Sequence, residues 1–202
     1  MRTTFIETQD EYGLRRHRLL VQPDSRYLAV ILPGSGYSAE RPLLHYSVSL
    51  ALEQGCDVLT IDYGPGEHGN HDFVSILEAA AEAIRQAEQP YHRQIILIGK
   101  SYGTLVAGKL TNRIRRPYLL VFFTPVRSTL SFMNGDRFIA FSGTEDPLLS
   151  MDEIRRWFNG SHPGYYLYPG ANHSLEIPDN TWDSLDILHD VLGKMEDFCF
   201  PR

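Results

Sequence analysis

The chain has 202 residues, of which 43% are hydrophobic, and a formal net charge of −6. A chain of this length buries about 70% of its unfolded surface in one core and is too short for two ordinary domains, so we expect a single domain over residues 1–202. Its 19 lysines and arginines form no basic stripe, which argues against a nucleic-acid partner. Without an apolar stretch long enough for a signal peptide or a membrane span, we expect a cytoplasmic protein with no membrane partner.

Strand and helix patterns alternate along the chain. Helical periodicity is expected at 40–54, 71–88, 102–115, 147–158 and 180–197, and strands are expected at 3–8, 16–22, 27–33, 57–63, 94–100, 118–124, 137–142 and 164–169. The last six strands are mostly continuous apolar runs, typical of strands covered on both faces. This order predicts an α/β fold: a doubly wound, mostly parallel eight-stranded sheet with helices on both faces.

The first two strands and the two cysteines add details to this layout. Residues 9–13 are too few for a parallel crossover, so the first two strands should form an antiparallel hairpin at the edge of the sheet. Cys56 and Cys199 lie far apart in the sequence, and in a cytoplasmic protein we expect two reduced thiols.

A serine stands at the corner between a predicted strand and a predicted helix, in the segment Gly99-Lys100-Ser101-Tyr102-Gly103. Small residues two before and two after Ser101 allow the backbone to turn sharply and to present the hydroxyl above the edge of the sheet. Asp146 follows the seventh predicted strand and His173 follows the eighth. The three residue types of a hydrolytic triad therefore occur in the order serine, acid, histidine.

These segments resemble the α/β-hydrolase superfamily, in particular small capless carboxylesterases and dienelactone hydrolase-like serine hydrolases. The resemblance implies Ser101 as the nucleophile, His173 as the general base and Asp146 as the acid that orients the histidine. Glu145 is an alternative acid, but the position of Asp146 just before proline matches the family pattern. The implied activity is cleavage of a small ester or thioester, a reaction that needs no metal and no cofactor.

The resemblance also implies an oxyanion hole of two backbone N–H groups, from Tyr102 and from the loop after the third strand. In that loop Pro33-Gly34-Ser35 takes the place of the family's histidine-glycine motif, which indicates Ser35 as the second donor. The proline departs from the family pattern, so the choice between Ser35 and Gly36 stays open. Gly34, Gly36 and Tyr37 are candidate substrate contacts.

Substrate access should be open, because residues 125–136 are too few to form a cap domain. Phe132 and Met133, with Tyr102, are candidate pocket walls, although the first two could equally fill the core. Arg127 is a candidate for recognising a substrate carboxylate.

Several motifs are interpreted as structural. The Gly64–Gly69 run matches a dinucleotide fingerprint but carries a proline where a phosphate needs an N–H, and His68, His71 and Asp72 are too weak a set for a metal site. Lys100 and Lys109 are expected to be solvated or packed along their stems.

Two other classes of function remain: a non-catalytic ligand-binding or scaffold protein, and a lyase or carbon–carbon bond hydrolase using the same triad. Singly, Ser101 could be a buried turn residue, Asp146 a helix N-cap and His173 a loop histidine. The sequence does not indicate the oligomeric state.

Overall fold

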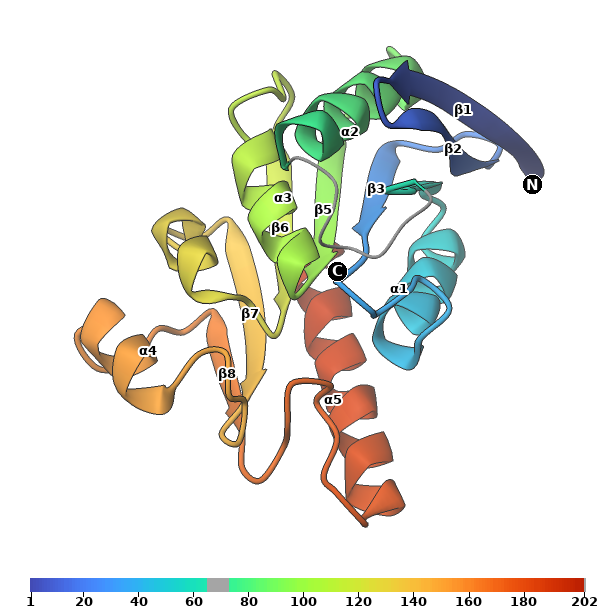
Figure 1. Cartoon of the computed structure of the whole chain (residues 1–202). Helices are drawn as coiled ribbons and strands as arrows, with labels where there is room; N and C mark the ends of the chain where they lie inside the picture. Colours follow the sequence, from blue (N-terminus) through green and yellow to red (C-terminus); the bar gives the residue numbers. More distant parts are fainter. Residues whose placement is uncertain (65–72, 202) are drawn as a thin grey trace.

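The computed structural model describes residues 1–64 and 73–201. Eight strands form one sheet in the order β1-β2-β4-β3-β5-β6-β7-β8 (Figure 1). Their bounds are β1 (Arg2–Asp10), β2 (Gly13–Val21), β3 (Tyr27–Leu32), β4 (Asp57–Thr60), β5 (Gln94–Lys100), β6 (Tyr118–Phe123), β7 (Phe138–Gly143) and β8 (Tyr165–Tyr168). The strands from β3 to β8 are parallel, whereas β2 is antiparallel to both of its neighbours. The predicted edge hairpin and the mostly parallel sheet are therefore confirmed.

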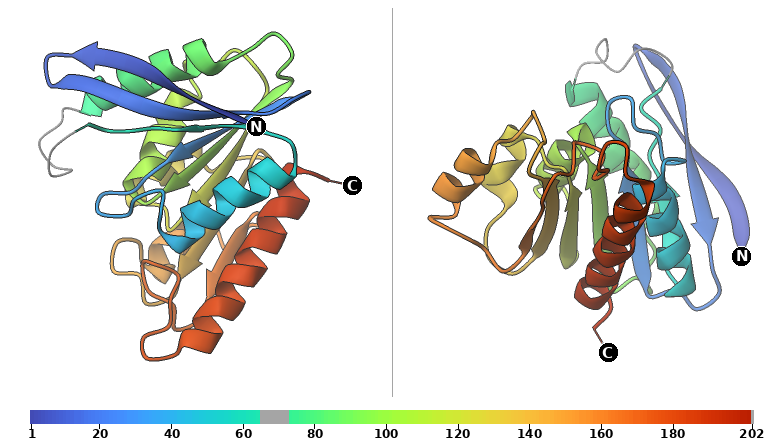
Figure 2. Two further views of the ribbon diagram at one scale, coloured as in Figure 1. Left: turned by 90° about the vertical axis from the view of Figure 1, so that its right-hand side faces the viewer. Right: turned by 90° about the horizontal axis from the view of Figure 1, so that it is seen from below.

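Helices cover both faces of the sheet (Figure 2). They are α1 (Pro42–Glu53), α2 (Phe73–Ala87), α3 (Tyr102–Leu110), α4 (Met151–Trp157) and α5 (Thr181–Cys199), with a 3₁₀ helix η1 (Arg127–Phe132). Alternate residues of each central strand face opposite layers: Leu97 of β5 belongs to the apolar cluster beneath α2 and α3, and Ile98 to the cluster beneath α1 and α5. Burial on both faces explains the continuous apolar runs of the central strands.

Two predicted helices are longer than those observed. The stretch predicted as 147–158 becomes helical only at Met151, because Asp146 Oδ1 accepts the N–H of Leu148 in a turn and Ser150 with Glu153 forms a capping box. The stretch predicted as 102–115 ends at Leu110, where Thr111 donates its hydroxyl to the carbonyl of Gly108 and the next bonds are of the tighter i→i+3 kind.

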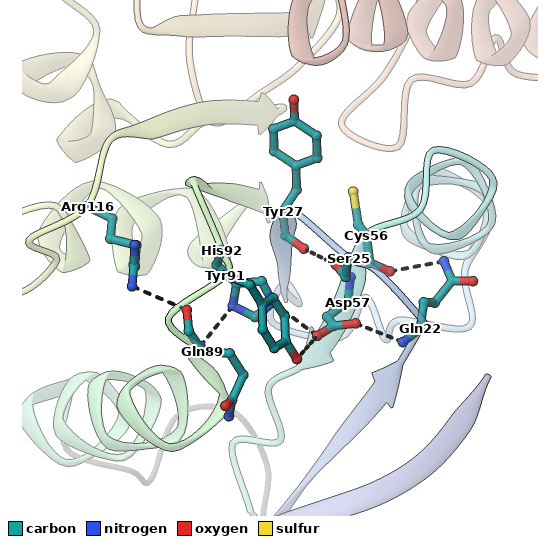
Figure 3. A network of polar contacts seen from close by, with 9 residues as sticks. All are labelled: Gln22, Ser25, Tyr27, Cys56, Asp57, Gln89, Tyr91, His92 and Arg116. Carbon is teal, nitrogen blue, oxygen red and sulfur yellow. Dashed lines mark hydrogen bonds and ion pairs between the residues drawn. The ribbon is translucent and has the colours of Figure 1, made fainter.

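The amino end of β4 is anchored by a buried polar network (Figure 3). Asp57 accepts hydrogen bonds from the backbone N–H of Gln22 at 2.8 Å and from His92 Nε2 at 3.0 Å. Ser25 Oγ accepts the N–H of Asp57 and donates to the carbonyl of Tyr27. The network lies at the amino ends of the parallel strands, so it fixes the sheet at the edge away from Ser101.

Cys56 and Cys199 are buried free thiols, as expected. Within residues 1–64 and 73–201, no helix is long and apolar enough to cross a membrane. The cytoplasmic location stays a prediction.

Candidate active site

Ser101 stands between β5 and α3 in a strained turn. Its backbone has φ +52° and ψ −118°, which side-chain-bearing residues rarely adopt. The N–H of Ser101 donates to the carbonyl of Phe123 on the neighbouring strand, and this bond ties the turn to the sheet. The strain is thus maintained by the surrounding structure and directs the side chain out of the strand.

The two glycines that flank the turn are required by close backbone packing. A Cβ on Gly99 would lie 2.6 Å from the carbonyl oxygen of Gly103, and a Cβ on Gly103 would lie 2.0 Å from that of Leu32. Both distances are far below an allowed contact, so neither position accepts a side chain. The small residues noticed in the sequence are explained by the tight seating of α3 against β3 and β5.

His173 connects Ser101 to Asp146. Its Nε2 lies 2.8 Å from Ser101 Oγ, and its Nδ1 lies 2.8 Å from Asp146 Oδ2. The carboxylate fixes the hydrogen on Nδ1, so the lone pair of Nε2 faces the serine hydroxyl. The Asp146 side chain is fully buried, whereas that of His173 is 25% exposed. This geometry allows the imidazole to take a proton from the hydroxyl at a site that solvent and small molecules can reach.

The loops that carry the acid and the histidine are packed against each other. A Cβ on Gly143, the last residue of β7, would lie 1.9 Å from the carbonyl oxygen of Ala171. The N–H of Glu145 donates to that same carbonyl, and the Glu145 side chain is directed to solvent. Of the two neighbouring acids, Asp146 is therefore the one in contact with His173.

The loop after β3 forms a tight turn beside Ser101. We call this loop (Gly34–Tyr37) the oxyanion loop, after the role that the resemblance implies for it. Gly34 and Tyr37 exchange backbone hydrogen bonds of 3.0 and 3.2 Å, and a Cβ on Gly34 would lie 3.3 Å from Ser101 Cβ. Gly36 has φ +70°, a conformation that glycine adopts without strain. In the described part of the chain no group accepts from the N–H of Ser35 or of Gly36, so both remain candidate donors beside Tyr102, the first residue of α3.

A cavity of about 490 Å³ adjoins the site on the side of α1 and α5. Tyr37 of the oxyanion loop and Ser174, next to His173, both line it, together with apolar side chains that include Leu43, Leu175 and Ile177. The described residues that line it include no lysine or arginine. This cavity is a candidate space for part of a substrate.

Three candidate substrate contacts from the sequence lie on the other side of the site. Met133 is 2% exposed within the core, and Phe132 packs over Gly108 of α3, where a Cβ would lie 2.3 Å from its ring. Met133 therefore fills the core, the alternative expected for it, and Phe132 is partly buried against the same core. Arg127 is exposed and pairs with Glu153 of α4, so its charge is already compensated.

Sequence reasoning missed the burial of Lys100. Lys109 is exposed as expected, but Lys100 is 1% exposed and its Nζ lies 4.9 Å from the centroid of the Tyr37 ring. The signal was available in the strand period, because Ile96, Ile98 and Lys100 alternate onto one covered face of a central strand. The expectation that Lys100 is solvated is wrong: its stem is packed, as the other alternative had it, and its ammonium group is covered as well.

Residues 65–72 lie outside the described part of the chain. The glycine-rich run after Gly64 and the set His68, His71 and Asp72 fall there, so their interpretation stays a prediction.

Comparisons with known proteins support the fold. No family model and no curated protein matches the sequence. Solved structures do match: an α/β serine hydrolase homologue from Coxiella burnetii (TM-score 0.71, 14% identity, 96% of this chain and 98% of that one) and a serine hydrolase without a lid from Xanthomonas campestris (0.67, 18%, 96% and 94%). An esterase from Pyrococcus furiosus also matches (0.65, 16%, 96% and 92%).

Between β6 and β7 the chain carries only the single 3₁₀ helix η1, so no lid is inserted at this point. The sheet order, the strained serine turn and these structural neighbours agree. The chain has the α/β-hydrolase fold in its capless form.

Proposed function

We propose that this protein is a serine hydrolase that cleaves a small carboxylic ester or thioester through an acyl-enzyme on Ser101. One observation carries the proposal: His173 lies within 2.8 Å of both Ser101 Oγ and Asp146 Oδ2. A serine hydroxyl becomes an effective nucleophile when a base removes its proton during attack, and such general base catalysis contributes about 10² to 10⁴ in rate.

Acylation begins when Ser101 Oγ attacks the carbonyl carbon and His173 Nε2 takes the hydroxyl proton. Asp146 stabilises the imidazolium, and the N–H of Tyr102 with that of Ser35 or Gly36 donates to the oxyanion; each such donor is worth roughly 10² to 10³ in turnover. The intermediate collapses as the bond to the leaving group breaks, and His173 returns the proton to the departing alcohol or thiol. Water then attacks the acyl-enzyme by the same route and releases the acid and free Ser101.

Small uncharged substrates fit the surroundings best. Among the described residues, no lysine or arginine lines the cavity beside the oxyanion loop. The charge of Arg127, which lies elsewhere, is compensated by Glu153. A substrate carboxylate would therefore meet no cation among the described lining residues, and two acids, Glu176 and Asp179, are part of that lining. We expect acetyl and butyryl esters and thioesters to be cleaved faster than esters that carry a second, ionised carboxylate.

The test is reaction with a small fluorophosphonate, followed by intact-mass measurement and peptide mapping. The expected result is one adduct, on Ser101, and its absence in Ser101→Ala. Ser142→Ala is a matched control: this serine is also buried at the end of a central strand, but its hydroxyl is bonded to Tyr165 at 2.7 Å, so the adduct should persist.

The outcomes separate the classes of function. Folded wild-type protein that forms no adduct would overturn the proposal and favour a ligand-binding protein. An adduct without hydrolysis of any acyl ester would favour a lyase or a carbon–carbon bond hydrolase, which product analysis would identify.

A further inference from the structure

Lys100 is a buried cation immediately before the proposed nucleophile. It is 1% exposed, and among the described residues no carboxylate lies within salt-bridge distance of its ammonium group. Burying an unpaired ammonium group is costly, so a lysine at this position calls for an explanation beyond packing. Its contact is the Tyr37 ring, whose centroid lies 4.9 Å from Nζ, within the range of a cation–π interaction.

Tyr37 belongs to the oxyanion loop and is held at both ends. Its backbone exchanges two hydrogen bonds with Gly34, and its hydroxyl accepts the N–H of Leu43, in the first turn of α1, at 3.1 Å. Gly34 in turn packs on the strand that carries the lysine, since a Cβ there would lie 3.0 Å from the carbonyl oxygen of Lys100. The loop and the serine turn therefore meet through Lys100, by its backbone on one side and its ammonium group on the other.

We infer that Lys100 is a positioning residue: its ammonium group holds the Tyr37 ring and so fixes the oxyanion loop against the turn that carries Ser101. The inference rests on the proposed function, because the aligned groups are the N–H donors of Ser35 or Gly36 and of Tyr102. Lys100 touches no substrate in this scheme. It contributes by keeping two donors on different loops at a fixed separation, and transition-state stabilisation depends on that preorganisation.

The groups that face Lys100 predict a pH signature. Asp146 from the turn after β7 and Glu176 from the loop after β8 favour the charged lysine, and the Tyr37 ring lies against it. Burial outweighs the two acids and lowers the pKa of Lys100 to about 8. The ammonium group is thus present below this pH and lost above it, so kcat should decline as pH rises through about 8.

The experiment compares Lys100→Met with Lys109→Met. Lys109 is a matched control, because its Nζ also lies over an aromatic ring, that of Phe132 at 5.7 Å, but on the exposed side of α3. For Lys100→Met we expect kcat to fall about 10- to 100-fold, less than the loss of a whole oxyanion donor, with KM within about threefold and no decline in kcat near pH 8. Lys109→Met should retain the wild-type kcat and pH profile.

Thermal unfolding separates positioning from a purely structural role. Replacing a buried charge by an apolar side chain of similar length is often neutral or stabilising, so the Tm of Lys100→Met should not fall while its kcat does. If this variant does not fold, Tyr37→Leu must show the same loss of kcat; its KM is not a criterion, because Tyr37 also lines the cavity.

The failures are distinguishable. Wild-type protein that forms no fluorophosphonate adduct overturns the proposed function and this inference together. Wild-type protein that reacts, with an unchanged kcat in Lys100→Met or in Tyr37→Leu, overturns the inference alone.

Discussion

Two histidine–aspartate pairs lie at opposite ends of the parallel strands, and they differ in which ring nitrogen carries the hydrogen. In the pair at the amino ends of the strands, His92 Nδ1 accepts the N–H of Gln89 at 3.0 Å, so Nε2 carries the hydrogen and donates to Asp57 (Figure 3). In the pair at the carboxyl ends, Nδ1 of His173 donates to Asp146 and Nε2 is left to accept from Ser101.

The free lone pair decides what each imidazole can do. The His92 ring is 0% exposed and both of its nitrogens are used by the protein, so it holds the loop before β5 onto β4 and can take no proton without losing a bond. The His173 ring is partly exposed and its accepting nitrogen faces a hydroxyl. A histidine next to a buried aspartate is therefore not by itself a catalytic pair; the partner of the second nitrogen makes the difference.

Replacing each histidine by alanine should affect different properties: the His173 variant should lose activity, and the His92 variant should lose stability. We expect His173→Ala to lower kcat by about 10⁴ or more. Water can take the place of this partly exposed ring beside Asp146, so the loss of stability should be smaller than for His92→Ala. His92→Ala should cost about 1.5–3 kcal/mol of stability, because it removes a hydrogen bond to a buried carboxylate that keeps only the Gln22 N–H and the Tyr91 hydroxyl as donors, while the folded fraction keeps its turnover. Esterase assays and urea unfolding of both variants check this. Loss of turnover in folded His92→Ala would contradict the assignment of roles.

Substitution of the two neighbouring acids, Asp146 and Glu145, tests which of them orients His173. Asp146→Asn should reduce kcat about 10⁴-fold, because the amide no longer selects the tautomer that leaves Nε2 free. Glu145→Gln is the control at the adjacent position, and since its side chain is in solvent its kcat should stay within about twofold of wild type. Steady-state kinetics of the two variants decides between them, and the reverse result would move the acid to Glu145.

The sequence predicted the residues that meet at the carboxyl ends of the parallel strands better than those at the amino ends, for a physical reason. Ser101, Asp146 and His173 each follow a strand, and parallel strands bring their carboxyl ends to one edge, so local patterns were enough to place them together. The Asp57–His92 contact joins residues 35 apart through a loop without a motif, and nothing local marks it. The burial of Lys100 was also missed, because a charged residue at a strand end is ordinarily solvated; the strand period places it on a covered face, where the Tyr37 ring lies over its ammonium group.

A third histidine, His17, tests whether burial keeps an imidazole neutral in the fold. His17 Nδ1 accepts the N–H of Asp62 at 3.1 Å and Nε2 donates to Thr8 Oγ1 at 2.8 Å, and burial lowers its pKa to about 4. Between pH 6.5 and 4 the unfolded chain binds a proton that the folded chain does not, so stability should fall on acidification by about 3 kcal/mol from this residue. Urea unfolding at pH 7 and pH 4.5 should show a smaller difference for His17→Gln than for wild type. Equal pH dependence in the two proteins would mean that His17 binds a proton as readily in the folded chain as in the unfolded chain.

The smallest effects are expected for two arginines, Arg116 near the amino ends of the parallel strands and Arg127 near their carboxyl ends. Arg116 donates to the carbonyl of Gln89, whose N–H holds His92, so Arg116→Ala should cost about 1 kcal/mol of stability.

Arg127 is 73% exposed in its pair with Glu153, and such an exposed pair contributes little to stability. Because Glu153 compensates its charge, Arg127→Ala should change the preference for neutral over anionic esters by less than about threefold, measured as a ratio of kcat/KM values. A tenfold loss of activity on the anionic ester alone would instead make Arg127 the group that recognises a substrate carboxylate, and the catalytic edge would then select substrates by charge as well as by shape.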